Sequence, residues 1–279
     1  MSIFPTKILL ATEGSEEGQL AATTAARLAN ITGSELYILT VEPAWGAREA
    51  CGVLAEHVRK IESVGGEVSR SYARKGSAAE EVCALAEELG TGLIAMGSRG
   101  WGRIRRLAMG SVSDSVVRHA HCAVMVVRWK PIVFPAKMLL AIDGSESATL
   151  AAKTAADLAD RTGCELHVAH VGWVFHGAYV GWNVGPLPPG ISQEALDRGA
   201  RTLLEAEVER VKGMGAEVAG AHLRRGRADE EIVVLAEELG ADMVVMGCRG
   251  QGGMKRALMG SVSDSVLRHA HCPVLVARA

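Results

Sequence analysis

Short apolar runs alternate with amphipathic stretches along the first half of the chain. Residues 8–11 form a continuous apolar run, which is typical of a strand buried on both faces of a sheet. Residues 16–31 carry apolar side chains at helical spacing, and Gly33 just beyond them fits a helix C-terminus. The same reasoning predicts strands at 36–41, 68–73, 93–96 and 124–127, and helices at 54–64, 77–89 (opened by a Ser77-x-x-Glu80 capping box) and 111–119. This alternation predicts a parallel sheet with helices on both faces.

The pattern then starts again. Lys7-Ile-Leu-Leu-Ala-Thr-Glu-Gly-Ser15 reappears as Lys137-Met-Leu-Leu-Ala-Ile-Asp-Gly-Ser145, and residues 97–128 reappear as 247–278. The second copy is longer, with its extra residues between 171 and 202, and prolines at 131 and 135 mark a short connector. We therefore predict two tandem, doubly wound, Rossmann-like α/β domains with five-stranded parallel sheets. They cover residues 1–130 and 136–279.

Composition and charge narrow the function classes. Apolar residues make up 48% and charged residues 22% of the chain, and the net charge of −2 favours neither nucleic acid nor an anionic membrane surface as a partner. No apolar run approaches the roughly 18 residues that a membrane span needs. The residues before Lys7 are too few for a secretory signal, and the six cysteines are scattered. Together these features predict a cytoplasmic protein.

A glycine-rich loop follows the fourth strand of each copy. Gly97-Ser-Arg-Gly100 is followed by nine residues and then Gly110-Ser111, and the second copy has Gly247-Cys-Arg-Gly250 and Gly260-Ser261 at the same spacing. The last Gly-Ser opens a helix, whose N-terminus attracts phosphate. Basic side chains in the loops would add contacts: Arg103, Arg105, Arg106, Lys255 and Arg256. The alternative is a glycine-rich turn before a helix capped by Ser111-x-x-Asp114. Phosphate binding is favoured because the loop occurs twice, each time between a strand and a helix.

These motifs resemble the universal stress protein family. The resemblance rests on G-x2-G-x9-G-S after an apolar strand, on Arg-His-Ala-x-Cys-x-Val-x-Val, and on the opening Ile-Leu-Leu-Ala-x-(Glu/Asp)-Gly-Ser. It covers both copies nearly end to end. It implies an adenine-nucleotide-binding fold in which the last strands pair, here as a pseudo-dimer inside one chain. Nothing in the sequence decides whether whole chains pair further as a homodimer.

The resemblance also implies which residues contact the nucleotide. In the second copy they are Ala141, Asp143, Val171, Met246, Gly247, Gly250, Gly260, Ser261 and Val262. In the first copy they are Ala11, Glu13, Val41, Met96, Gly97, Gly100, Gly110, Ser111 and Val112. Glu13 departs from the family's aspartate, so we expect the second copy to bind ATP, or ADP or AMP, more strongly. Mg²⁺ would accompany the phosphates.

Other chemistry has less support. His119-Ala-His-Cys122 and its repeat 269–272 contain metal-ligand types, but residues two apart on a helix point to different faces, and no second ligand pair is evident. The chain has no G-x-S-x-G elbow, P-loop or dinucleotide fingerprint, and we expect no catalytic residues. We therefore predict a nucleotide-binding stress-response regulator that is not an enzyme, apart from weak ATPase activity. A slow ATP hydrolase and an interaction module without nucleotide are the alternatives.

The extra residues of the second copy are aromatic. Trp173, Phe175, Tyr179 and Trp182 fall in the segment 172–190, which follows the second strand at the ligand end of the sheet. The segment either packs on its own domain and pseudo-dimer mate or forms a lid or partner surface. Trp101 in the first glycine-rich loop raises the same two alternatives.

Overall fold

The computed structural model describes residues 5–42, 49–98, 109–134, 136–172, 192–250 and 259–278, without the side chains of 49–51. The N-terminal half contains β1 (Lys7–Ala11), α1 (Glu16–Thr32), β2 (Glu35–Glu42), α2 (Glu49–Ser63), β3 (Arg70–Lys75), α3 (Ala78–Leu89), β4 (Leu93–Gly97), α4 (Ser111–His119) and β5 (Ala123–Val127). The C-terminal half contains β6 (Lys137–Ile142), α5 (Glu146–Thr162), β7 (Glu165–Gly172), α6 (Gln193–Gly213), β8 (Val218–Arg225), α7 (Ala228–Leu239), β9 (Met243–Gly247), α8 (Ser261–His269) and β10 (Val274–Ala277). Both halves repeat the predicted order of elements.

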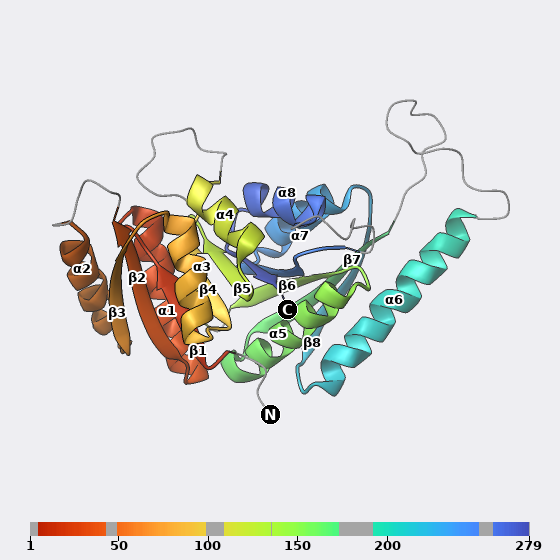
Figure 1. The fold of residues 1–279 in the computed structure, drawn as a ribbon. Coiled ribbons are helices and arrows are strands. Elements are labelled where there is room, and N and C mark those ends of the chain that lie inside the picture. Colours follow the sequence, from red (N-terminus) through yellow and green to blue (C-terminus); the bar gives the residue numbers. More distant parts are fainter. Residues whose placement is uncertain are drawn as a thin grey trace.

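All the described strands belong to one sheet that runs through both halves. Its order is β3-β2-β1-β4-β5-β10-β9-β6-β7-β8, and pairing is parallel within each half (Figure 1). The last strands, β5 and β10, pair antiparallel, with Met125 opposite Leu275. The predicted fold class is confirmed, and the halves meet through the last strands, as the family resemblance implied.

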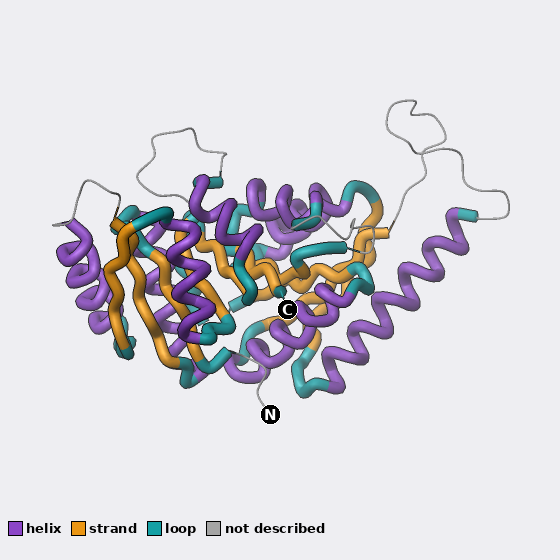
Figure 2. Tube along the Cα trace, in the orientation of Figure 1, coloured by secondary structure: helices purple, strands orange, loops and turns teal. Residues whose placement is uncertain are grey.

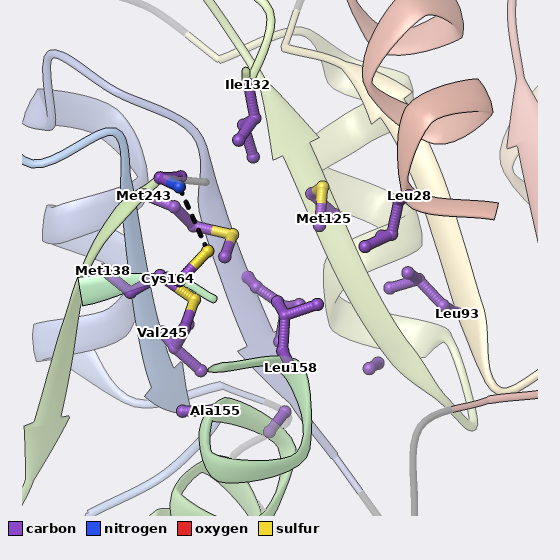
Figure 3. Packing of buried hydrophobic residues seen from close by; sticks show 14 of the residues in the cluster. Leu28, Leu93, Met125, Ile132, Met138, Ala155, Leu158, Cys164, Met243 and Val245 are labelled. Atoms are coloured by element: carbon purple, nitrogen blue, oxygen red, sulfur yellow. Dashed lines mark hydrogen bonds between the residues drawn. The ribbon is translucent and has the colours of Figure 1, made fainter. Parts of the chain in front are cut away.

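Helices cover both faces of this sheet (Figure 2). The core on one face includes residues of α1, α2, α5 and α6, and the core on the other includes residues of α3, α4, α7 and α8. Both cores contain residues from both halves. Figure 3 shows Leu28 and Met125 of the N-terminal half near Leu158 of the C-terminal half in one cluster. Since hydrophobic packing is continuous across the junction, the division into separate domains stays a prediction.

Charged side chains of α4 and α8 cross the junction. Arg118 Nη2 donates to Asp264 Oδ1 at 2.7 Å, and Arg268 Nη2 donates to Asp114 Oδ1 at 2.6 Å. Each arginine also donates through Nε to the aspartate of its own helix at 2.9 Å. Two aspartates and two arginines thus form a closed ring of alternating charge between the halves.

A second arginine from each half reaches the end of the opposite helix. Arg128 Nη1 donates to the carbonyl oxygens of Leu267 and Arg268 at 2.9 and 2.8 Å, near the C-terminus of α8. Arg278 Nη1 donates to the carbonyls of Arg118 and Ala120 at 2.8 Å, at the end of α4. The last carbonyls of a helix lack partners within it and carry partial negative charge, so a guanidinium stabilises them. The junction is therefore hydrogen-bonded reciprocally.

A few local predictions were wrong. β3 begins at Arg70 and not at 68, because this outermost strand is largely exposed and its apolar signal is weak. Ser77 is the N-cap of α3, but its side chain makes no capping bond. Glutamates in the first turn of α3 stabilise this end of the helix instead, because their negative charge interacts favourably with the helix dipole.

The predicted end of the first helix is confirmed: Gly33 ends α1, with a left-handed φ of 69°. The 21-residue α6 exceeds the 15-residue α2, so part of the extra length of the second copy is helix.

Candidate functional site

The predicted strand-end residues meet at the carboxyl edge of each half. Ala11 at the end of β1 pairs with Met96 of β4, and Ala141 of β6 pairs with Met246 of β9. All four are buried. The two predicted valines stand near the ends of the neighbouring strands β2 and β7. Ligands of doubly wound folds bind beyond such strand ends, at the point where the strand order reverses.

In the C-terminal half, Asp143 stands directly after β6 in the turn to α5. Its Oδ1 accepts a hydrogen bond from the backbone N–H of Ser145 at 3.0 Å. Ser145 is the N-cap of α5, and its Oγ accepts from the N–H of Ala148 at 3.1 Å. A Cβ at Gly250 would lie 2.6 Å from Asp143 Oδ2. A side chain at this position would therefore make the carboxylate of Asp143 move, whereas glycine leaves the loop backbone and the carboxylate in close contact.

The start of the same loop is fastened to α5. A Cβ at Gly247 would lie 2.6 Å from the carbonyl carbon of Ser147 and 2.8 Å from the backbone nitrogen of Ala148, so the end of β9 packs directly on the first turn of the helix. The hydroxyl of Ser145 donates to the carbonyl of Arg249 at 3.1 Å, and the hydroxyl of Ser147 also donates to that carbonyl. These contacts hold the loop entrance at a defined position.

The end of the loop leads into the N-terminus of α8. The N–H of Gly260 donates to the carbonyl of Cys248 at 2.8 Å, and the hydroxyl of Ser263 donates to the same oxygen at 3.0 Å. Gly260 is the N-cap and provides no side-chain cap, and Ser261 is exposed in the first turn. The first N–H groups of a helix have no acceptor within it, so this turn offers an anion site.

The N-terminal half repeats this backbone arrangement. A Cβ at Gly97 would lie 2.8 Å from the carbonyl carbon of Glu17, and the N–H of Gly110 donates to the carbonyl of Ser98 at 2.8 Å. Gly110, and not Ser111, is the N-cap of α4. The Ser111-x-x-Asp114 cap is therefore wrong, since Asp114 binds arginines of the junction instead.

The side chains at the two sites differ. Glu13 replaces Asp143 and accepts a hydrogen bond from the hydroxyl of Ser15, and burial raises the pKa of Glu13 above its usual value. Oε2 of Glu17 accepts a hydrogen bond from the fully buried hydroxyl of Ser98. We did not predict Glu17 from the sequence, although the repeat places it opposite Ser147.

The buried side chain of His57 is a second feature that we did not predict from the sequence. His57 is 1% exposed, and its Nδ1 lies 2.9 Å from the carbonyl of Val53, so Nδ1 carries the proton. Its Nε2 lies 2.9 Å from the hydroxyl oxygen of Thr12. The C-terminal half has Ile142 in place of Thr12. A cavity of about 460 Å³ beside this pair involves none of the predicted nucleotide contacts; it is lined by Gln19, Glu56, His57, Arg59 and Lys60.

Several predicted features lie outside the described residues. They are Gly100, Trp101, the loop residues Arg103, Arg105, Arg106, Lys255 and Arg256, and the aromatic segment apart from Gly172. The lid and packing alternatives for that segment therefore stay open.

The histidine and cysteine repeats end the helices α4 and α8. His119 Nδ1 lies 2.8 Å from the carbonyl of Ser115 in the last turn of α4. Burial raises the pKa of both Cys122 and Cys272 to about 12, so neither thiol is a ready thiolate. Among the described residues, no three candidate metal ligands gather. The described helices include none long and apolar enough to cross a membrane.

Comparison with known solved structures agrees with this architecture. A universal stress protein of Archaeoglobus fulgidus superimposes with a TM-score of 0.71 at 24% identity, covering 98% of both chains. A Pseudomonas aeruginosa protein of unknown function has a TM-score of 0.74 at 22% identity, covering 98% of this chain and 92% of its own. At these identities the likeness establishes the fold.

Sequence comparisons identify the family. A universal stress protein of Mycobacterium tuberculosis is 35% identical over 194 residues, which cover 67% of this chain and 61% of the relative. One of Methanocaldococcus jannaschii is 33% identical over 145 residues, covering 51% of this chain and 81% of its own. This chain thus spans less than two thirds of the mycobacterial relative. The model of the universal stress protein family matches residues 5–128 and again residues 136–278. The chain therefore belongs to the universal stress protein family, with two copies of its domain in tandem.

Proposed function

We propose that the protein binds an adenine nucleotide, ATP or its hydrolysis products, and acts as a stress-response regulator without appreciable turnover. The stronger site is that of the C-terminal half. The observation that carries the proposal is the cradle formed by Gly250 against Asp143, followed by the N-terminus of α8 at Gly260. Asp143, on the turn beside the loop, offers a carboxylate that can accept from a ribose hydroxyl, and the helix N-terminus at the end of the loop can bind phosphate.

The arrangement favours binding over hydrolysis. Asp143 is the acidic residue that follows β6, and its carboxylate already accepts a backbone hydrogen bond from Ser145. A group engaged in holding its own turn is poorly suited to activating water. Mg²⁺ enters the proposal only as the counter-ion of the phosphates, because no set of candidate metal ligands gathers among the described residues.

The first test is to purify the chain without added nucleotide, denature it and identify released small molecules by mass spectrometry. Titration calorimetry with ATP then compares the wild type with Gly260→Ala. A Cβ at Gly260 would meet protein atoms only at 3.4 Å or beyond, and its φ of −78° suits alanine. The variant should therefore fold, but its methyl group would occupy the space that phosphate approaches. We expect ATP affinity at this site to fall at least about tenfold.

Two controls make the test specific. Gly199→Ala adds a methyl group where no atom lies within 4 Å, and it should leave ATP binding unchanged. Gly110→Ala reports on the N-terminal site. A protein that neither carries nor binds ATP, ADP or AMP would contradict the proposal and favour an interaction module. Steady release of ADP, abolished by Asp143→Asn, would favour a slow hydrolase.

A further inference from the structure

The first turn of the first helix carries different charges in the two halves. Glu17 in α1 and Ser147 in α5 occupy equivalent positions, because each packs against the glycine that ends the neighbouring strand. A Cβ at Gly97 would lie 3.0 Å from Glu17 Cβ, and a Cβ at Gly247 would lie within 3 Å of Ser147 atoms. The backbone is therefore clamped in both halves, and the side chain at this position must extend beside the entrance of the glycine-rich loop.

In the N-terminal half, hydrogen bonds place this carboxylate close to the start of α4. Glu17 accepts from the hydroxyl of Ser98, which is 0% exposed. The carbonyl of the same Ser98 accepts from the N–H of Gly110 and from the hydroxyl of Ser113, both at 2.8 Å. Ser98 is therefore hydrogen-bonded both to the carboxylate of Glu17 and to Gly110, the N-cap of the helix that would bind phosphate.

In the C-terminal half, the same position is neutral. The hydroxyl of Ser147 donates to the carbonyl of Arg249, and Cys248 replaces the serine that holds the carboxylate. The N-terminal half places two carboxylates, Glu13 and Glu17, at this edge of the sheet. At the two equivalent positions the C-terminal half has one carboxylate, that of Asp143, and the neutral Ser147. The hydrogen bond from Ser98 holds the carboxylate of Glu17 at the loop entrance, where its negative charge would act on an approaching anion.

We propose that Glu17 is a specificity-determining residue: it restricts the N-terminal site to a nucleoside or nucleoside monophosphate, whereas Ser147 lets the C-terminal site accept di- and triphosphates. This inference rests on the proposed function. The carboxylate of Glu17 and a phosphate bound nearby carry like charges in a half-buried site, and their repulsion should lower affinity on the order of tenfold. The repulsion grows with each phosphate and weakens with salt.

The test exchanges the two residues in the full chain and titrates adenosine, AMP, ADP and ATP. The N-terminal site is read in a Gly260→Ala background and the C-terminal site in a Gly110→Ala background. Glu17→Ser should raise the affinity of the N-terminal site for ATP on the order of tenfold and leave its affinity for adenosine unchanged. Ser147→Glu should lower the affinity of the C-terminal site for ATP by a similar factor.

Two further variants separate charge from shape. Glu17→Gln keeps an acceptor for Ser98 but removes the charge, so it should raise ATP affinity as Glu17→Ser does. Glu16→Ser removes the same charge from the neighbouring exposed position and should have a much smaller effect. The proposal is overturned if Glu17→Gln leaves ATP binding unchanged, which would mean that loop arginines already compensate the charge. It is also overturned if ATP binds the wild-type N-terminal site only with Mg²⁺ and Glu17→Ser abolishes that binding.

The titrations distinguish a failure of nucleotide binding from a failure of the role of Glu17. If neither site of any variant binds an adenine compound, the proposed function itself fails. If both wild-type sites bind ATP equally, the proposed function stands and the role of Glu17 fails.

Discussion

The two halves share a backbone at the sheet edge but differ in the side chains placed there. Gly97 and Gly247 both pack on the first turn of a helix where a Cβ has no room, so the loop entrance follows the same path twice. Glu17 and Ser147 sit on that common backbone with different charge. The comparison teaches that close backbone packing preserves the geometry of a duplicated site, while side chains that extend into the site remain free to diverge in chemistry.

The junction and the outer strands also differ in how far their residue types agree between the two halves. At the junction, the aspartate and arginine of α4 and α8 are the same residue types in both halves and bond reciprocally. At the outer strands, Tyr37 and Tyr72 of the N-terminal half are replaced by His167 and His222. At the junction, each side chain contacts the equivalent helix of the other half, so a change in one half disturbs the contact with the other. At the outer strands, the two side chains contact each other within one half, so they can be replaced together as a pair.

The largest effect is expected from the buried arginine of the junction. Arg128 is 2% exposed and donates hydrogen bonds to carbonyls at the end of α8, whereas its counterpart Arg278 is only partly buried. Arg128→Ala leaves buried carbonyls without donors and opens a cavity, so we expect a loss of about 3–4 kcal/mol in the free energy of unfolding. Arg278→Ala should cost about half as much, because water replaces part of the lost contacts. Urea unfolding measures both, and equal losses would contradict the comparison.

The second-largest loss of stability is expected from a substitution that disturbs the packing of the loop entrance. Gly247→Ala forces a methyl group to within 2.6 Å of the backbone of α5, and overpacking of this kind costs about 1–3 kcal/mol. Gly260→Ala, whose methyl group has room, should cost less than about 1 kcal/mol. Thermal unfolding of the two variants gives the comparison. A Gly247→Ala protein as stable as Gly260→Ala would show that the helix and loop are not in tight contact.

A smaller effect is expected from the charge ring at the junction. The hydrogen bond from Arg118 lowers the pKa of Asp114 below its usual value of 3.8. The resulting stability is present above that usual value and is lost as the pH falls through the lower pKa of the folded state. Asp114→Asn should cost about 1 kcal/mol at neutral pH, since these side chains are near 30% exposed and partly screened. Its unfolding free energy should also fall less steeply with acid than that of the wild type.

The smallest effect is expected at the outer strands. Burial, reinforced by nearby His167, lowers the pKa of His222 below 6.5. Between that lowered value and 6.5 the unfolded chain binds more protons, so stability declines as the pH falls through this window. His222→Tyr, which copies Tyr72 of the other half, should remove this dependence. Unfolding measured from pH 7 downward tests it, and an unchanged slope would show that another group titrates there.

Much of the fold could be predicted from the sequence because its signals are local. Continuous apolar runs identified the buried strands, and Gly33 marked a helix end that only a residue tolerant of positive φ can adopt cheaply. The resemblance to the universal stress protein family implied that the last strands pair inside one chain, which β5 and β10 do. The exposed β3 was placed less well, since a strand with solvent on one side carries a weaker apolar pattern.

Parts of the candidate site could not be predicted, because they depend on residues far apart in the sequence. The carboxylate of Glu17 reaches the loop through Ser98, and the imidazole of His57 reaches the end of β1 through Thr12. The cap predicted at Ser111 failed for the same reason, because Asp114 is recruited by arginines across the junction.

The sequence by itself determined the order of strands and helices, the duplication and the positions of the glycines that shape the loops, since each follows from spacing and from the conformations open to single residues. Only the tertiary structure decided which charges stand beside each loop and how the halves interlock. Those properties arise from distances between side chains on different elements, and these distances exist only once the sheet has brought the elements together.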